Sequence, residues 1–115
     1  MTYERGRLYE RAEDFFDLDG SVGMKLTPDA AIDTCRRAAA HGLVIARIEG
    51  GIWHKPGFES RLDCIWDGDD PPIEVCEADK NNLRAAKFIE SEMKIHTVFI
   101  LTAPPLTGWR HLNKN

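Results

Sequence analysis

Acidic side chains are concentrated between residues 59 and 79, and this is where the sequence could support binding or chemistry. The segment holds eight acidic residues and one basic residue, Arg61, so its formal charge is −7. The whole chain carries −4, which leaves +3 for the remainder. A surface of this sign attracts a basic partner and accelerates its association. Carboxylates can also hold a metal ion or exchange protons with a substrate, provided that they converge in a cleft.

Six of these carboxylates and two apolar side chains form the predicted partner-binding site. Residues 58–67 alternate like a strand, so three candidates should share its outer face. The other acidic candidates follow in the turn and at the start of the next helix, and could continue that surface. Tryptophan is frequent among the residues that dominate binding energy, so Trp53, which lies close to Gly50-Gly51, is added as a candidate. The predicted site consists of Asp63, Asp67, Asp69, Asp70, Glu74, Glu77, Trp53 and Ile65.

The same residues do not form a recognisable catalytic arrangement. Asp63 and Asp67 would stand about 13 Å apart at roughly 3.3 Å per residue, which is too far to share a metal ion by themselves. Phosphate-cradle, dinucleotide and nucleophile-elbow motifs are absent from the sequence. No histidine pair has helical spacing, and no histidine lies near a cysteine in a metal-binding arrangement. We therefore predict no catalytic residue, no metal site and no cofactor.

The three cysteines, Cys35, Cys64 and Cys76, do not indicate a disulfide framework, because their number is odd and no CxxC pair occurs. Cys64 is expected on the core-facing side of its strand, which favours packing over reactivity. A cysteine-dependent enzyme remains an alternative, and it would require a thiol that is alkylated unusually fast at neutral pH.

Composition indicates a folded protein and excludes several other classes. The 115 residues are 43% hydrophobic and 30% charged, which is ordinary for one globular domain spanning residues 1–115. Net negative charge and scattered basic residues argue against a nucleic-acid partner. The charged N-terminus is unlike a signal peptide, and no apolar run approaches the roughly 20 residues that span a bilayer. We expect a cytoplasmic protein with no membrane association.

Helical spacing of apolar residues predicts three helices. The first spans residues 3–18. The second has Thr27 as N-cap and Pro28 as its first residue, and Gly42 ends it. The third spans about residues 78–93, and its expected inner face consists of Leu83, Ala86, Ile89 and Met93.

Three strands are predicted beside these helices. Residues 43–49 are rich in β-branched residues, and Gly50-Gly51 is expected to end the strand. Residues 58–67 alternate with period two, with Phe58, Cys64 and Trp66 turned inwards. Residues 96–103 are apolar on both faces, so the last strand should be central and covered on both sides. The order is helix, helix, strand, strand, helix, strand, which gives an α+β two-layer sandwich with a small mixed sheet.

The segments HGLVIARIEGGIWHKPGFESRLDCIWDG and HTVFILTAPPL, with a helix between them, resemble the small cytosolic immunity proteins of bacterial toxin systems, including contact-dependent growth inhibition. The resemblance covers about residues 42–106 and lies in an acidic single domain whose sheet carries a crossover helix. It implies a non-enzymatic protein that binds a cognate toxin domain, often a nuclease, at its active site or an adjacent exosite. One toxin domain per chain is expected.

An alternative function is a small regulatory or ligand-binding α+β domain. In this hypothesis the segment Gly50–Phe58 is a loop that forms one wall of a pocket. A small molecule that raises the thermal stability of the protein would favour this alternative over a toxin-binding protein.

Overall fold

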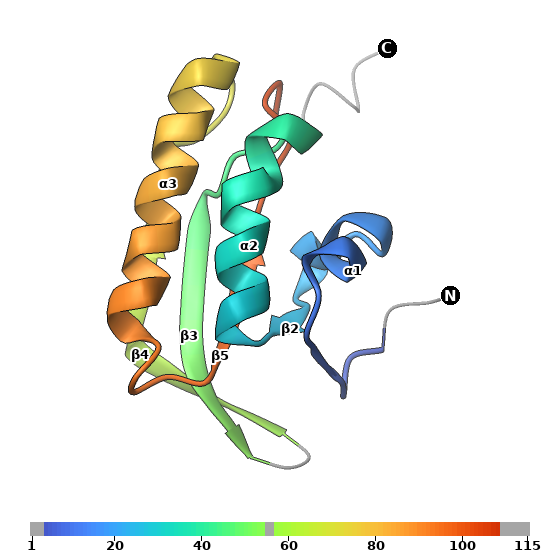
Figure 1. Cartoon of the computed structure of the whole chain (residues 1–115), viewed down its shortest axis with the longest axis vertical. Helices are drawn as coiled ribbons and strands as arrows, with labels where there is room; N and C mark the ends of the chain where they lie inside the picture. Colours follow the sequence, from blue (N-terminus) through green and yellow to red (C-terminus); the bar gives the residue numbers. More distant parts are fainter. Residues whose placement is uncertain (1–3, 55–56, 109–115) are drawn as a thin grey trace.

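The computed structural model describes residues 4–54 and 57–108, with the side chain of Leu62 excepted. Two long helices lie side by side over one face of a sheet (Figure 1). The elements are β1 (Leu8–Tyr9), α1 (Ala12–Asp17), β2 (Lys25–Leu26), α2 (Pro28–Ala38), β3 (Arg47–His54), β4 (Gly57–Asp67), α3 (Val75–Glu92) and β5 (Val98–Thr102), with short 3-10 helices at Gly20–Val22 and Ala39–His41.

The five strands form one mixed sheet in the order β1-β2-β5-β3-β4. The β1 and β2 strands pair in parallel, whereas every other neighbouring pair is antiparallel. This confirms the predicted α+β sandwich, its mixed sheet and the central position of the last strand. Sequence patterns did not predict β1 and β2, because two residues are too few to show a period. At the other end of the order, β4 is an edge strand.

The boundaries of α2 are those that its capping residues predict. The Thr27 hydroxyl oxygen accepts a hydrogen bond from the Ala30 amide at 3.3 Å, and Pro28 is the first helical residue. The helix tightens into a 3-10 turn and ends at Gly42, whose φ of 75° is left-handed. These local signals act within a few residues, so the sequence alone is sufficient to locate them.

The predicted first helix is wrong over most of its length. Only Ala12–Asp17 is helical among the described residues of that segment, and Leu8–Tyr9 is instead a strand beside Lys25–Leu26. Tyr9 is fully buried, and its hydroxyl accepts a hydrogen bond from the Glu4 amide at 2.8 Å. Strand pairing and burial of Tyr9 therefore outweigh the helical spacing of the apolar residues, as tertiary contacts often do.

Gly50 and Gly51 do not end the strand that contains them, contrary to the prediction. Residues 43–46 precede β3, which begins at Arg47 and continues through both glycines to His54. A Cβ atom at Gly50 would overlap the Cys64 sulfur, and one at Gly51 would overlap the Glu59 carbonyl oxygen. The glycines therefore permit close approach of β4. Residues 50–54 and 57–58 belong to paired strands and do not form the predicted pocket-wall loop. The alternative of a ligand-binding domain is therefore wrong in placing a loop here.

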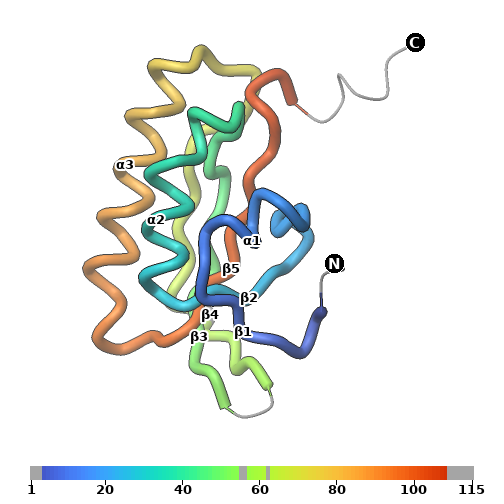
Figure 2. Tube along the Cα trace, turned by 45° about the vertical axis from the view of Figure 1, so that its right-hand side comes forward, coloured from blue at the N-terminus to red at the C-terminus, as the bar shows by residue number. Residues whose placement is uncertain are grey.

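The core lies between the sheet and the pair formed by α2 and α3, which run along the same face in both views (Figure 2). Cys64 is buried as predicted, and Trp66 packs against the core beside Phe88. The expected inner face of α3 is partly wrong: Ala86 and Ile89 are buried, but Leu83 is 45% exposed. Asn81 and Asn82 take up buried positions on this helix instead. Trp109, which the sequence suggests as an anchor for the C-terminal segment, lies outside the described residues.

Candidate partner-binding surface

The outer face of β4 presents three of the predicted site residues together. Asp63, Ile65 and Asp67 alternate along the strand and are all exposed, whereas Cys64 between them is fully buried. Ile65 is 38% exposed, which is unusual for a large aliphatic side chain in a sheet. The strand therefore displays one apolar side chain between two carboxylates, on the face opposite its contacts with the core.

Residues of two neighbouring strands extend this face. Glu49 of β3 is paired with Ile65 on one side and with Ile100 of β5 on the other, so these side chains share the face. Glu49 and Ile100 are half-buried. Sequence reasoning did not include Glu49, although its alternation with buried Ile48 could have indicated it. Because Ile100 is only half-buried, the central strand is less covered on this face than predicted.

Arg47 reduces the negative charge at one end of this face. Its guanidinium donates hydrogen bonds to both carboxylate oxygens of Asp67, at 2.7 and 3.3 Å. The Asp67 carboxylate raises the pKa of Arg47 through these bonds. The two residues are directly paired across β3 and β4, although 20 positions separate them in the chain. We define Arg47, Glu49, Asp63, Ile65, Asp67 and Ile100 as the open face.

The turn after β4 is anchored to α3 and carries the next two carboxylates. The Asp69 amide donates a hydrogen bond to the Asn81 side-chain oxygen at 2.8 Å. The Asp69 carboxylate also accepts a bond from Arg84 at 3.3 Å. Asp70 is exposed and lines an open concavity of about 460 Å³ together with Pro71. The buried asparagine therefore fixes the position of this acidic turn relative to the helix.

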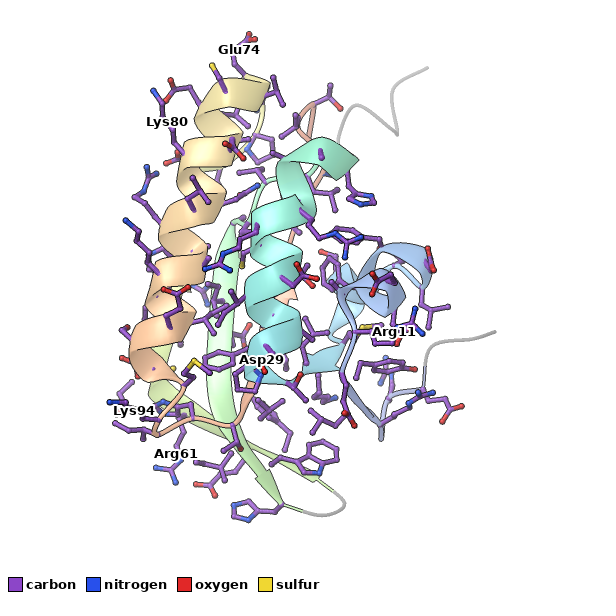
Figure 3. All side chains as sticks on the ribbon, viewed as in Figure 1. Arg11, Asp29, Arg61, Glu74, Lys80 and Lys94 are labelled. Atoms are coloured by element: carbon purple, nitrogen blue, oxygen red, sulfur yellow. The ribbon has the colours of Figure 1, made fainter. Side chains whose placement is uncertain are left out.

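The remaining acidic candidates lie at the start of α3. Glu74 is the N-cap residue, and Glu77 lies in the first turn, where the helix dipole favours negative charge. Lys80 contacts the Glu77 carboxylate at 3.5 Å. Figure 3 shows Glu74 and Lys80 at one end of the molecule and Arg61 at the other. The six predicted carboxylates thus follow one another along the chain, from the outer face of β4 through the turn to the start of α3, and we call them the acidic band.

Trp53 is not part of this band. It is half-buried near the far end of β3, where it pairs with Phe58, whereas Arg47 and Asp67 pair at the opposite end of the same ladder. Its amide donates a hydrogen bond to the Thr97 hydroxyl at 3.0 Å. The structure thus separates Trp53 from the acidic turn, which the sequence could not reveal because β3 was predicted to stop at Gly50.

The buried thiols have the properties of packing residues rather than nucleophiles. Burial raises the pKa of Cys35 well above its usual range. Burial, followed by the nearby Glu92 carboxylate, raises the pKa of Cys64 to about 11. Both thiols are therefore protonated at neutral pH, while Cys76 is exposed on α3. This argues against the alternative of a catalytic cysteine at either buried position.

Comparison with known proteins identifies the family. The model of the colicin E5 immunity protein family matches residues 24–103, which span β2 to β5. The chain belongs to this family. The immunity protein CdiI of Burkholderia pseudomallei is 62% identical over 109 residues, which are 95% of this chain and all of that relative. The Escherichia coli colicin-E5 immunity protein and colicin-E5 immunity protein in ColE9 are each 39% identical over 80 residues, covering 69% of this chain and 96% of each relative.

Membership of the colicin E5 immunity family confirms the resemblance predicted from residues 42–106. The family match includes all six residues of the open face and the acidic residues that follow β4, as far as Glu77. It begins after β1 and α1, whereas the match with the CdiI relative covers nearly the whole chain. Among the described residues, no helix combines the length and the apolar character that crossing a membrane requires.

Proposed function

We propose that this protein is a non-enzymatic immunity protein that binds a cognate bacterial toxin domain and keeps it inactive. The observation that carries this proposal is the match of residues 24–103 to the colicin E5 immunity family. It is supported by a relative named as an immunity protein that is 62% identical over 95% of the chain. The function follows from binding, so it requires a complementary surface rather than a catalytic site.

The open face and the adjoining acidic turn are the proposed binding surface. Ile65 supplies an exposed apolar centre, while Asp63, Asp67 and Glu49 surround it with carboxylates. This arrangement resembles stable interfaces, in which an apolar patch is enclosed by a charged rim. The face is built on paired strands and is therefore presented rigidly, which reduces the entropy lost on binding. Trp53 would contact the toxin only if the interface extended along the β3–β4 hairpin.

The carboxylates differ in how readily they could engage a basic partner. Asp67, Asp69 and Glu77 already contact Arg47, Arg84 and Lys80, respectively. Asp63, Asp70 and Glu74 are exposed, and none forms an ion pair with another described residue. Exposed ion pairs contribute little stability, so a basic toxin surface could replace the internal partners without a large loss. We therefore place the first contacts at the unpaired carboxylates.

The toxin is proposed to be a nuclease because the acidic surface of the immunity protein is negatively charged, as is the nucleic acid that a nuclease binds. An enzyme that cleaves nucleic acid needs a basic site for the phosphate backbone. A band of carboxylates could occupy that site or a neighbouring basic surface, and would exclude the substrate in either position. The interaction should be accelerated by electrostatic attraction and weakened by salt. We expect one toxin domain to bind one copy of the immunity protein.

A matched pair of charge reversals tests this surface. The triple variant Asp63→Lys, Asp70→Lys, Glu74→Lys reverses the three unpaired carboxylates. It is compared with Glu10→Lys, Asp17→Lys, Glu90→Lys, which changes the net charge equally at other exposed positions. Association with the cognate toxin domain is measured by stopped-flow fluorescence at several salt concentrations. We expect the first variant to slow association at least about 10-fold at low salt, because steering of this kind contributes 10- to 1000-fold.

The control variant should associate nearly as fast as the unaltered chain, because its reversed charges lie outside the proposed contact. Equal slowing of both variants would show that only net charge matters, and unchanged binding of the first variant would overturn the proposed surface. Thermal unfolding of each variant confirms that it is folded. Toxin activity in the presence of each variant then tests neutralisation separately from the position of the binding surface.

A further inference from the structure

Three side chains of different metal-ligand types meet on the helix side of the sheet. Cys64 comes from β4, Glu92 ends α3, and His96 lies just before β5. One ligand atom from each lies within 4.8 Å of the other two. The Cys64 sulfur is 3.8 Å from a Glu92 carboxylate oxygen, and His96 Nδ1 is 3.2 Å from the same oxygen. Sequence patterns did not indicate this cluster, because 28 positions separate Cys64 from Glu92.

Two of the three separations, those that involve Glu92, are close to those of a tetrahedral metal site. Zinc binds cysteine sulfur at about 2.3 Å, and histidine nitrogen or carboxylate oxygen at about 2.0–2.1 Å. Tetrahedral angles then place the ligand atoms about 3.3–3.6 Å apart. The two distances at Glu92 lie within a few tenths of an ångström of this range. The Cys64 sulfur and the His96 nitrogen lie within 4.8 Å of each other, so these two side chains would have to approach by up to about 1.2 Å for all three atoms to bind one ion.

A buried nitrogen without an aligned hydrogen bond is a second indication that this cluster can take up a ligand. His96 is only 5% exposed, and its Nδ1 atom is buried without a hydrogen bond among the described residues. The Glu92 oxygen is near enough but poorly aligned to accept one. Leaving a buried polar atom without a partner is costly, and such atoms are rare in folded proteins. A cation between Nδ1, the carboxylate and the sulfur would supply the missing interaction.

We propose that Cys64, Glu92 and His96 bind one zinc-class divalent ion, with a water molecule as the fourth ligand. A thiol, an imidazole and a carboxylate together match the ligand preference of zinc better than that of magnesium or calcium. Binding replaces the thiol proton of Cys64, which passes to solvent. The Glu92 side chain is 30% exposed, which gives the ion and the water a route from solvent.

The ion would join the end of α3 to β4 and to the start of β5. This position is on the opposite side of the sheet from Ile65 and is separate from the open face. The proposed metal site would therefore stabilise the fold without forming part of the toxin contact. It does not depend on the proposed immunity function.

Cobalt substitution tests the proposal on the full chain without an affinity tag. Cobalt(II) is added to the reduced protein and then displaced with zinc, while absorption is recorded. We expect one cobalt per chain, with a thiolate-to-cobalt charge-transfer band and the intense d–d bands of tetrahedral coordination. Cys64→Ser should abolish the charge-transfer band, whereas Cys76→Ser, which alters an exposed thiol, should leave it unchanged.

Zinc affinity, measured by competition with a chromophoric chelator, tests the other two ligands. His96→Gln and Glu92→Gln should each weaken binding at least about 100-fold, because loss of outer-sphere contacts alone costs 10- to 100-fold. His54→Gln is the matched control for His96. Failure of cobalt to bind, or a charge-transfer band that survives in Cys64→Ser, would overturn the site. If Cys64→Ser does not fold, the half-buried Glu92→Gln variant decides the question, with circular dichroism to establish that it is folded.

Discussion

At the scale of single residues, Asn81 and Asn82 link α3 to the chain that precedes β3. Asn82 accepts a hydrogen bond from the Ile45 amide at 2.8 Å and donates one to the Leu43 carbonyl at 3.1 Å. Asn81 donates to the Ile45 carbonyl at 2.9 Å and accepts from the Asp69 amide. Both side chains are buried, so water cannot replace these bonds. The two side chains therefore supply hydrogen-bond partners for backbone groups of residues 43–46, which are not part of a strand.

Replacing Asn82 with leucine should lower the free energy of unfolding by about 2–6 kcal/mol. The substitution leaves the buried Ile45 amide and Leu43 carbonyl without partners, at about 1–3 kcal/mol for each. Urea unfolding monitored by circular dichroism measures the change. Leu83→Ala on the same helix is the control, and it should cost less than about 1 kcal/mol because Leu83 is largely exposed. A more stable Asn82→Leu variant would contradict the assigned role.

The asparagine pair also shows why the inner face of α3 was predicted only in part. Ala86 and Ile89 were correct, since apolar spacing identifies them directly. Leu83 was preferred over its polar neighbours because it is large and apolar. The position of Leu83 is instead decided by distant backbone groups that require amide partners. These backbone groups lie nearly 40 residues before α3 in the chain, so the spacing of apolar residues within the helix contains no information about them.

At the scale of secondary structure, the long β3–β4 hairpin depends on the absence of side chains at Gly50 and Gly51. Pairing shifts at this point, because Glu49 is opposite Ile65 while Gly51 is opposite Ser60. Atoms of Cys64, Glu59 and Phe58 in β4 occupy the space that side chains at Gly50 and Gly51 would need. Such an irregularity bends and twists a strand pair locally. The irregular pairing near Gly51 therefore separates the part of the hairpin under α3 from the part that carries Trp53.

Gly51→Ala should destabilise the protein by about 1–3 kcal/mol, as expected for overpacking a buried site. The added methyl group would overlap the Glu59 carbonyl oxygen and the Phe58 ring, and backbone atoms cannot move aside as a flexible side chain can. Thermal and urea unfolding measure the loss. Gly57→Ala is the matched control, because its nearest neighbour would be 3.8 Å away. It should be neutral or slightly stabilising, and equal losses in the two variants would contradict the packing argument.

Elements with local signals were predicted well, and those set by distant contacts were not. The cap at Thr27 and the left-handed Gly42 defined α2 closely, because both act within one turn. A glycine pair, in contrast, can end a strand or allow another strand to approach. Only the position of Cys64 and Phe58 in space distinguishes these two outcomes. The segment before α1 was similarly decided by pairing with β2.

At the scale of the whole molecule, helices on one face of the sheet leave the other face available. Period-two alternation correctly placed Asp63, Ile65 and Asp67 together, since a single strand determines it. The prediction overestimated the free negative charge, because Arg47 and Arg84 come from other elements and contact Asp67 and Asp69. Trp53 was included because tryptophan is frequent among the residues that dominate binding energy, but the structure places it at the far end of the β3–β4 pair. The fold class was therefore easier to predict than the composition of the candidate site.

Ile65→Ala should accelerate dissociation of the toxin domain by about 10-fold, equivalent to about 1.4 kcal/mol. Ile65 is the exposed apolar residue at the centre of the open face, and interface substitutions act mainly on dissociation. Surface plasmon resonance measures the rate. Ile95→Ala provides the control, because Ile95 is 65% exposed but lies beyond the end of α3. If both variants dissociate at the same rate as the unaltered protein, Ile65 does not anchor the toxin.

The position of β4 at the edge of the sheet has a consequence for the protein in the absence of its partner. An edge strand of 11 residues could pair with the same strand of another copy and begin aggregation. Two such edges would bring Asp63 and Asp67 of one copy close to like charges of the other, and the shifted pairing near Gly51 makes the edge irregular. The carboxylates proposed to attract a toxin would thus also keep copies of the immunity protein apart while they accumulate.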